Sequence, residues 1–194
     1  MKLQQLKEEI LRCRECEELF GYEPHPVFFG HSESKVMQIS QAPSLLVHET
    51  GKPFNDLSGK KLRREWYQIE DEVFYNPDYF YITSMAHCYP GKNPKGGDRI
   101  PPKNCAKKWM LLELESVDNL IYIIIGRHAS NYFFPKKNFT DLVFQDQVIN
   151  GKPAYVLPHP SPLNTKWLKD RPEFEKKRMP EIRKVLHNVL NINK

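Results

Sequence analysis

The chain has 194 residues, enough for a single hydrophobic core, and we expect one domain over residues 1–194. Lysine plus arginine exceed aspartate plus glutamate by 29 to 24, a mild excess that permits an acidic partner such as nucleic acid without requiring one. The longest strongly apolar run, Leu120 to Ile125, is too short to span a bilayer, and the charged, amphipathic N-terminus is no secretory signal. These features exclude a membrane protein and predict a cytoplasmic one.

The first predicted element is an amphipathic helix, because apolar residues recur at helical spacing from Leu3 to Leu11. Cys13 and Cys16 form a C-x-x-C pair at the C-terminal end of this helix, and the chain's other cysteines are Cys88 and Cys105. Structural disulfides are rare in cytosolic proteins, so we do not expect them here. A redox pair, four unrelated thiols and a four-thiolate site for zinc or an iron–sulfur cluster all remain open on spacing alone.

The first predicted strand starts at Val36 and is broken by Ala42-Pro43, since proline donates no ladder hydrogen bond. A long polar loop follows and is closed by Gly59. A loop between a strand and a helix lies at the carboxyl edge of an open α/β sheet, where such folds bind ligands. The alternative is a surface loop with a buried aromatic plug. The side chains of this loop that could bind a ligand or take part in catalysis are those of His48, Glu49, Phe54, Asn55 and Asp56.

A basic helix is predicted from Gly59 to Tyr67, with Leu62 and Trp66 on one face and the basic residues on the others. The basic residues are either a solvated helix face or a phosphate contact beside the loop. The second predicted strand, residues 78–85, runs into His87-Cys88 and a lysine-rich loop, and Pro101-Pro102 suits the start of the next helix.

The second half of the chain repeats the strand, loop and helix order. Residues 120–125 form a strand of the kind buried on both faces of a parallel sheet. Residues 148–157 predict a hairpin about Asn150-Gly151 that ends in a strand. A second edge loop, 158–164, and a helical tail, 172–189, follow. The alternation predicts a three-layer α/β/α sandwich with a central, mostly parallel four-stranded sheet.

Three features together resemble the uracil-DNA glycosylase superfamily. Gln41-Ala42-Pro43, followed after a gap by residues 51–54 (GKPF), resembles its first motif, and residues 159–163 (HPSPL) resemble its second. The four cysteines, with a pair near the N-terminus, one after the second strand and one at the next helix, resemble the iron–sulfur branch, family 4. Each motif alone is weak, whereas their ordered combination is specific and spans nearly the whole chain.

The resemblance implies a role for each loop. Phe54 matches the aromatic residue that stacks on a base flipped out of DNA, and His159 matches the histidine that contacts the base carbonyl as negative charge develops there. Leu163 stands where the family places an apolar wedge that enters the duplex. A core phenylalanine and a structural turn histidine are the plain alternatives. The other implied base and DNA contacts are Ala42, Ser84, Ser161, Lys60, Lys61 and Lys166.

Two positions depart from the family pattern. The iron–sulfur branch has Gly-Glu-Ala-Pro-Gly where this chain has residues 40–44 (SQAPS), so Gln41 cannot act as a general base, although its amide can still bind a base edge. Ser84 replaces the asparagine that reads uracil, which leaves selectivity for uracil open. Glu49 and Asp56 are the carboxylates left in the first loop to activate water, with His48 as a further candidate.

The resemblance implies an enzyme that hydrolyses the N-glycosidic bond of uracil or another deaminated base in DNA, as the first step of base excision repair. Its expected partner is single- or double-stranded DNA with a damaged base, bound by a monomer. A 4Fe–4S cluster is implied on the four cysteines, with zinc or an empty site as alternatives. A weakened relative that binds DNA without excision, and a hydrolase of free nucleosides, are the competing functions.

Overall fold

The computed structural model describes residues 2–21 and 23–192. Its centre is a five-stranded sheet of order β2-β1-β3-β5-β4. Strands β1, β2, β3 and β5 run parallel to one another, and β4 pairs antiparallel with β5. The predicted α/β class and mostly parallel sheet are confirmed, with one strand more than expected. The strands are β1 Val36–Ser40, β2 Phe80–Ser84, β3 Ile121–Ile125, β4 Gln147–Ile149 and β5 Lys152–Leu157.

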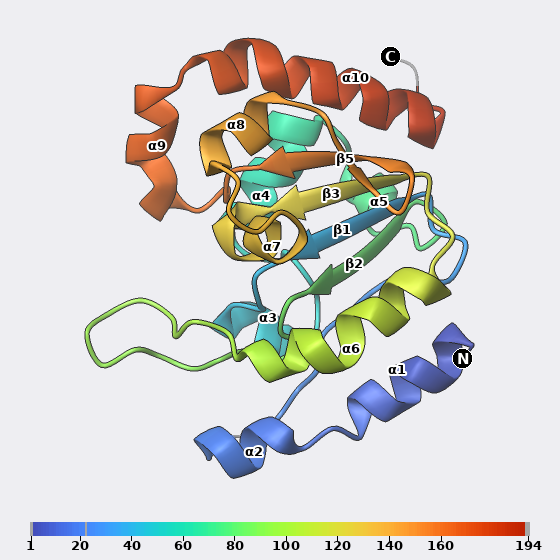
Figure 1. Cartoon of the computed structure of the whole chain (residues 1–194), viewed down its shortest axis with the longest axis vertical. Coiled ribbons are helices and arrows are strands. Elements are labelled where there is room, and N and C mark those ends of the chain that lie inside the picture. Colours follow the sequence, from blue (N-terminus) through green and yellow to red (C-terminus); the bar gives the residue numbers. More distant parts are fainter. Residues whose placement is uncertain (1, 22, 193–194) are drawn as a thin grey trace.

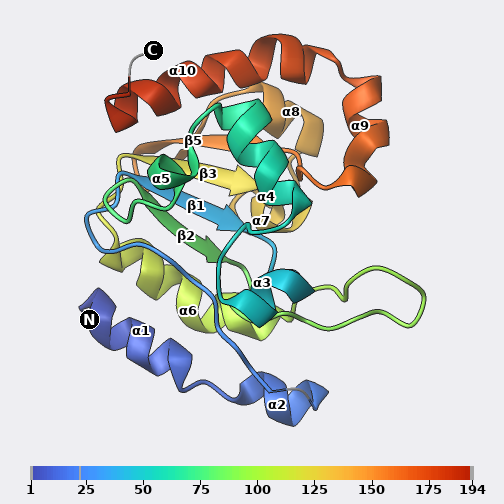
Figure 2. The same cartoon turned by 180° about the vertical axis from the view of Figure 1, so that it is seen from behind.

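The parallel strands are buried because helices cover both faces of the sheet. Every residue of β1, β2 and β3 is buried. In Figure 1, α7 (Gly126–Phe133) lies in front of the sheet, while α4 (Leu57–Lys61) and α5 (Asp71–Phe74) lie behind it; Figure 2 shows the reverse view. The sandwich thus has the predicted layers.

The remaining helices extend the two outer layers. At one end of the sheet, α1 (Leu3–Leu11) packs on α6 (Lys103–Ser116), and α2 (Glu15–Phe20) continues beyond α1 (Figure 1). At the other end, α8 (Phe139–Phe144) contacts β5, and α10 (Met179–Leu190) packs on the π-helical turn Leu62–Tyr67. A 3₁₀ turn, Pro162–Asn164, α9 (Thr165–Asp170) and a second π-helical turn, Phe174–Arg178, complete the C-terminal part. No helix among the described residues is both long and apolar enough to cross a bilayer.

Local sequence explains most of these elements. The β4–β5 hairpin turns at Asn150 and Gly151, both with positive φ (49° and 75°), as Asn-Gly turns require. Pro102 occupies the N-cap position of α6, so the helix begins where the Pro-Pro pair predicts. The expectation of an unbroken loop after β1 is wrong at α3 (Leu45–Thr50), a short helix whose N-terminus is capped by the Ser44 hydroxyl.

Candidate active site

A cavity of about 580 Å³ opens at the carboxyl edge of the sheet. The chain leaves β1 towards β2 on one side and leaves β3 towards β5 on the other, so the order of connections reverses between β1 and β3. Open α/β sheets bind their ligands at this reversal. The cavity is lined by residues that end or follow β1, β2 and β5, and these include Gln41, Ala42, Phe54, Asp56, Ser84, His159, Ser161 and Leu163.

Phe54 forms part of the cavity wall in a strained, tightly held backbone. Its φ is +53°, a left-handed conformation that non-glycine residues seldom adopt. Its ring meets Phe74 edge-on, with 6.2 Å between the ring centroids, and the residue is only 9% exposed. The phenolic hydroxyl of Tyr75 donates to the carbonyl of Pro53 (3.0 Å). These contacts hold the Phe54 ring in a single position.

Two further residues fix the Phe54 carbonyl. Arg63 donates to it through Nη1 (2.5 Å) and to Asp71 Oδ1 through Nε (3.0 Å), and its guanidinium lies over the rings of Phe74 and Tyr75. Gly59 packs so close that a Cβ there would stand 1.7 Å from the Phe54 oxygen. Sequence reasoning placed Arg63 in a surface cluster, whereas it is 7% exposed and supports the cavity wall.

His159 enters the cavity from the loop after β5 with its tautomer set by the backbone. The N–H of Ser161 donates to Nδ1 of His159 (3.2 Å), so a neutral imidazole carries its proton on Nε2. The side-chain amide of Asn164 donates to the His159 carbonyl (3.1 Å) and fixes the turn. Burial lowers the pKa of His159, and the nearby Asp56 carboxylate opposes this only in part. The imidazole is therefore a neutral hydrogen-bond donor at neutral pH.

The strand ends supply hydroxyl groups to the cavity, and the first loop supplies a carboxylate. Ser40 and Ser84, paired in register on β1 and β2, share a buried hydrogen bond of 3.0 Å between their hydroxyls. Asp56 caps α4 by accepting from the N–H of Gly59 (2.9 Å) while facing the cavity. Glu49 is exposed on α3 and does not line the cavity. Ser40 was missed by sequence reasoning, although aligning the two parallel strands would have paired it with Ser84.

Among the candidate DNA contacts, Ser161 and Leu163 line the cavity, whereas the lysines do not. Leu163 is 90% exposed, and its N–H donates to the Ser161 hydroxyl (3.2 Å). Lys60 and Lys166 are exposed. Lys61 instead pairs with Glu175 (3.0 Å), so its charge is partly compensated.

The four cysteines line a second, small cavity of about 20 Å³, between α1, α2 and the start of α6. Burial, together with the neighbouring thiols, raises the pKa of Cys88 to about 12. The ring Nδ1 of His87 lies 3.3 Å from the sulfur of Cys105. Bound metal deprotonates such thiols, so this donor set fits a thiolate-ligated centre in its chemistry. Among the described residues, no three metal-binding side chains are already placed to hold a single ion.

The family model of the uracil DNA glycosylase superfamily matches residues 27–183. The chain belongs to this superfamily. The match contains both edge loops of the cavity and two of the four cysteines, so the superfamily resemblance seen in the sequence is confirmed.

Two curated relatives are type-4 uracil-DNA glycosylases. The relative from Saccharolobus solfataricus is 28% identical over 137 residues, which are 69% of this chain and 59% of that protein. The relative from Archaeoglobus fulgidus is 24% identical over 144 residues, 73% of this chain and 67% of that protein. The first match thus spans less than two thirds of its relative. Both names agree with the iron–sulfur branch indicated by the cysteines.

Proposed function

We propose that this protein is a DNA glycosylase that hydrolyses the N-glycosidic bond of uracil or another deaminated base flipped out of DNA. One observation carries the proposal: Phe54 and His159, supplied by loops 105 positions apart in the chain, line the same cavity. A flipped base needs a stacking surface and a donor for its edge, and these two side chains offer both.

The chemistry follows from where charge develops. When the bond from the sugar to the base breaks, its electron pair moves onto the base, and water adds to the sugar carbon. A neutral imidazole with Nε2–H directed at the base carbonyl stabilises that charge, since the donor is already oriented by the Ser161 N–H. This interaction strengthens in the transition state, which makes His159 the principal catalytic group of the proposal.

We propose that the Asp56 carboxylate activates the attacking water by accepting its proton, which then neutralises the departing base. It is the carboxylate of the first loop that lines the cavity, whereas Glu49 is exposed outside it. Gln41 also lines the cavity, and its amide is able to bind water or the base edge. The hydroxyls of Ser40 and Ser84 each donate or accept, so they suit more than one pattern of base-edge groups.

We propose that Cys13, Cys16, Cys88 and Cys105 hold a 4Fe–4S cluster in a structural role. Four thiolates around one cavity are the ligand set of such clusters, and they would tie the N-terminal helices to the segment after β2. Zinc is the alternative occupant. Iron, sulfide and zinc analysis of anaerobically purified protein, with its visible absorbance, distinguishes them; a colourless protein without iron contradicts the cluster.

The test of function is release of free base from oligonucleotides, single- and double-stranded, that contain uracil, hypoxanthine or xanthine. We expect release from at least one substrate and strong loss in Phe54→Ala and His159→Ala. His31→Ala is a matched control, because this histidine lies at the opposite, amino edge of the sheet and pairs with Asp78. Unchanged release in both cavity variants would show that the cavity is not the active site.

A second candidate is a protein that binds damaged DNA without excision. Ser84 and Gln41 favour it, because each replaces a group that the family uses to read uracil or to help catalysis. Tight binding of uracil-containing DNA that depends on Phe54, with no base released from any substrate, would support this function over the first.

A further inference from the structure

The segment between the second and third strands forms an ordered hairpin that extends from the body of the molecule. Residues 91–99 fold back on themselves through an antiparallel bridge between Lys92 and Asp98, and the N–H of Arg99 donates to the carbonyl of Gly91 (2.9 Å). Figures 1 and 2 show this loop projecting beyond the carboxyl edge of the sheet. We call residues 91–99 the basic hairpin.

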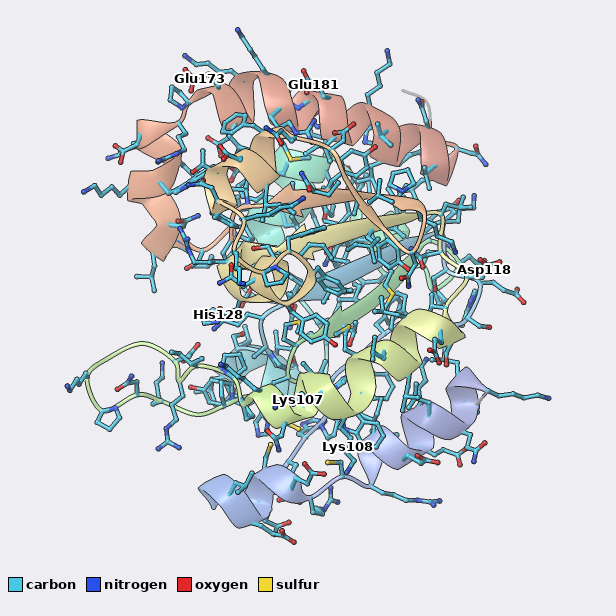
Figure 3. All side chains as sticks on the ribbon, in the orientation of Figure 1. Lys107, Lys108, Asp118, His128, Glu173 and Glu181 are labelled. Atoms are coloured by element: carbon cyan, nitrogen blue, oxygen red, sulfur yellow. The ribbon has the colours of Figure 1, made fainter. Side chains whose placement is uncertain are left out.

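The hairpin is fixed to the protein at its base. Buried Tyr89 donates its hydroxyl to Asp98 Oδ1 (3.0 Å), and Arg99 donates through Nε to the carbonyl of Lys92 (3.1 Å). Residues 92–100 are nevertheless all exposed, and side chains along the hairpin extend away from the body (Figure 3). These hydrogen bonds give the hairpin a defined shape.

Its position relates the hairpin to the cavity. Gly97 and Asp98 line the same cavity as Leu163 and Asn164. The hairpin follows β2 and the Leu163 loop follows β5, with β1 and β3 between these strands. The two projections therefore border the cavity from opposite ends, so the sugar-phosphate backbone of a DNA strand that delivers a base into the cavity would run between them.

Charge then indicates the partner. The hairpin carries Lys92, Lys95 and Arg99 against a single acid, Asp98, which already pairs with Lys92 and accepts from Tyr89. Lys103, which follows the hairpin, is also exposed. Clustered lysine and arginine at the path of a nucleic acid neutralise phosphates and release counterions.

We propose that the basic hairpin is a second DNA-contact surface, which holds the phosphate backbone on the side of the cavity remote from Leu163. The choice of DNA as partner rests on the proposed function. The surface itself is distinct from the base-binding residues and from the Leu163 loop. The protein would then contact the DNA strand at two separate places, the hairpin and the Leu163 loop. The cavity that takes the flipped base lies between these two contacts.

The test is the salt dependence of DNA binding by the full-length protein, measured by fluorescence anisotropy with a labelled undamaged oligonucleotide over a series of KCl concentrations. Lys92→Ala/Lys95→Ala removes two charges and keeps the Lys92 carbonyl that Arg99 uses. The slope of log K against log salt should fall by about 1 for each lysine removed. The matched control is Lys177→Ala/Lys184→Ala, which also removes two exposed lysines. These lysines belong to the C-terminal helical segment on which Figure 3 labels Glu181, and the variant should keep the wild-type slope.

Asp98→Asn supplies an opposite change, because it removes a negative charge and keeps an oxygen for Tyr89; it should steepen the slope. Equal slopes for the wild type and the hairpin double variant, with equal thermal unfolding midpoints, would overturn the inference and leave another partner, such as an acidic protein, for this surface. Reduced slope without base release by the wild type would support the hairpin and contradict the proposed glycosylase, so the two can fail separately.

Discussion

The two loops that form the cavity are held in different ways. Phe54 is fixed from behind, by Arg63 and Tyr75 on the carbonyls of its loop and by Phe74 against its ring. Leu163 extends into solvent at 90% exposure. One loop is thus a preformed wall of the cavity, whereas the other presents a solvent-exposed side chain, which under the proposed function gains its contacts when DNA binds. Substitutions in the first should change folding and function together, and in the second function alone.

The largest effect should come from His159, which belongs to the second loop but is anchored like the first. His159→Ala removes a donor aimed at developing charge, and we expect excision to fall by roughly 10² to 10³-fold. Single-turnover release of the base measures this. An unfolding free energy equal to that of the wild type would show that the loss is chemical, whereas wild-type excision would contradict the assigned role.

The strongest test of the first loop's rigidity is Gly59→Ala. A Cβ at this position would stand 1.7 Å from the Phe54 carbonyl oxygen, and backbone has little freedom to move away. We expect a loss of about 3 kcal/mol in unfolding free energy from overpacking, with impaired excision. Urea denaturation measures it, with Lys60→Ala as the exposed control one residue on. A neutral result would mean that the loop shifts readily.

The support of Phe54 by Arg63 should be visible as a smaller loss. Arg63→Lys cannot bond both the Phe54 carbonyl and Asp71 with the same geometry, so we expect about 2 kcal/mol of destabilisation. Tyr75→Phe, which removes one neutral hydrogen bond, should cost about 1 kcal/mol. In both variants stacking should weaken, detected with 2-aminopurine at the flipped position. Stability loss with unchanged stacking would limit these residues to folding.

The anchoring of His159 predicts the pH profile. Its pKa is lowered from the ordinary value of 6.5, and the neutral ring is the form that the Ser161 N–H supports. Excision should therefore be constant above pH 6.5 and fall as pH decreases through the lowered pKa, at most about tenfold per pH unit. The residual activity of His159→Asn should lack this fall. An identical acid limb in that variant would assign it to another group.

The smallest structural effect should be at Leu163. Leu163→Ala should leave the unfolding free energy within about 0.5 kcal/mol of the wild type, since the side chain is solvent-exposed. Excision from duplex DNA should fall several-fold more than excision from single strands, because only the duplex has a position to fill. Leu111→Ala, an exposed leucine on α6, is the matched control. Equal losses on both substrates would contradict a wedge.

The sequence predicted the parallel strands and both edge loops because each rests on local signals, such as the apolar run at 120–125 and the proline breaks. It did not predict α3, and the helix explains why Glu49 lies outside the cavity. It also placed Arg63 on the surface, since a period of 3.6 residues does not hold through the π-helical turn Leu62–Tyr67. No local pattern encodes that turn, because tertiary contacts with Glu175 and α10 stabilise it.

Strand β3 separates β1 from β5 and contributes no lining residue to the cavity, yet it determines the span between the loops that follow them. Adjacent strands are about 4.8 Å apart, so the two loops start roughly 10 Å from one another. Backbone hydrogen bonding sets this separation, and side-chain replacement in either loop leaves it unchanged. The side chains that line the cavity can therefore be exchanged while the distance between its two walls stays the same.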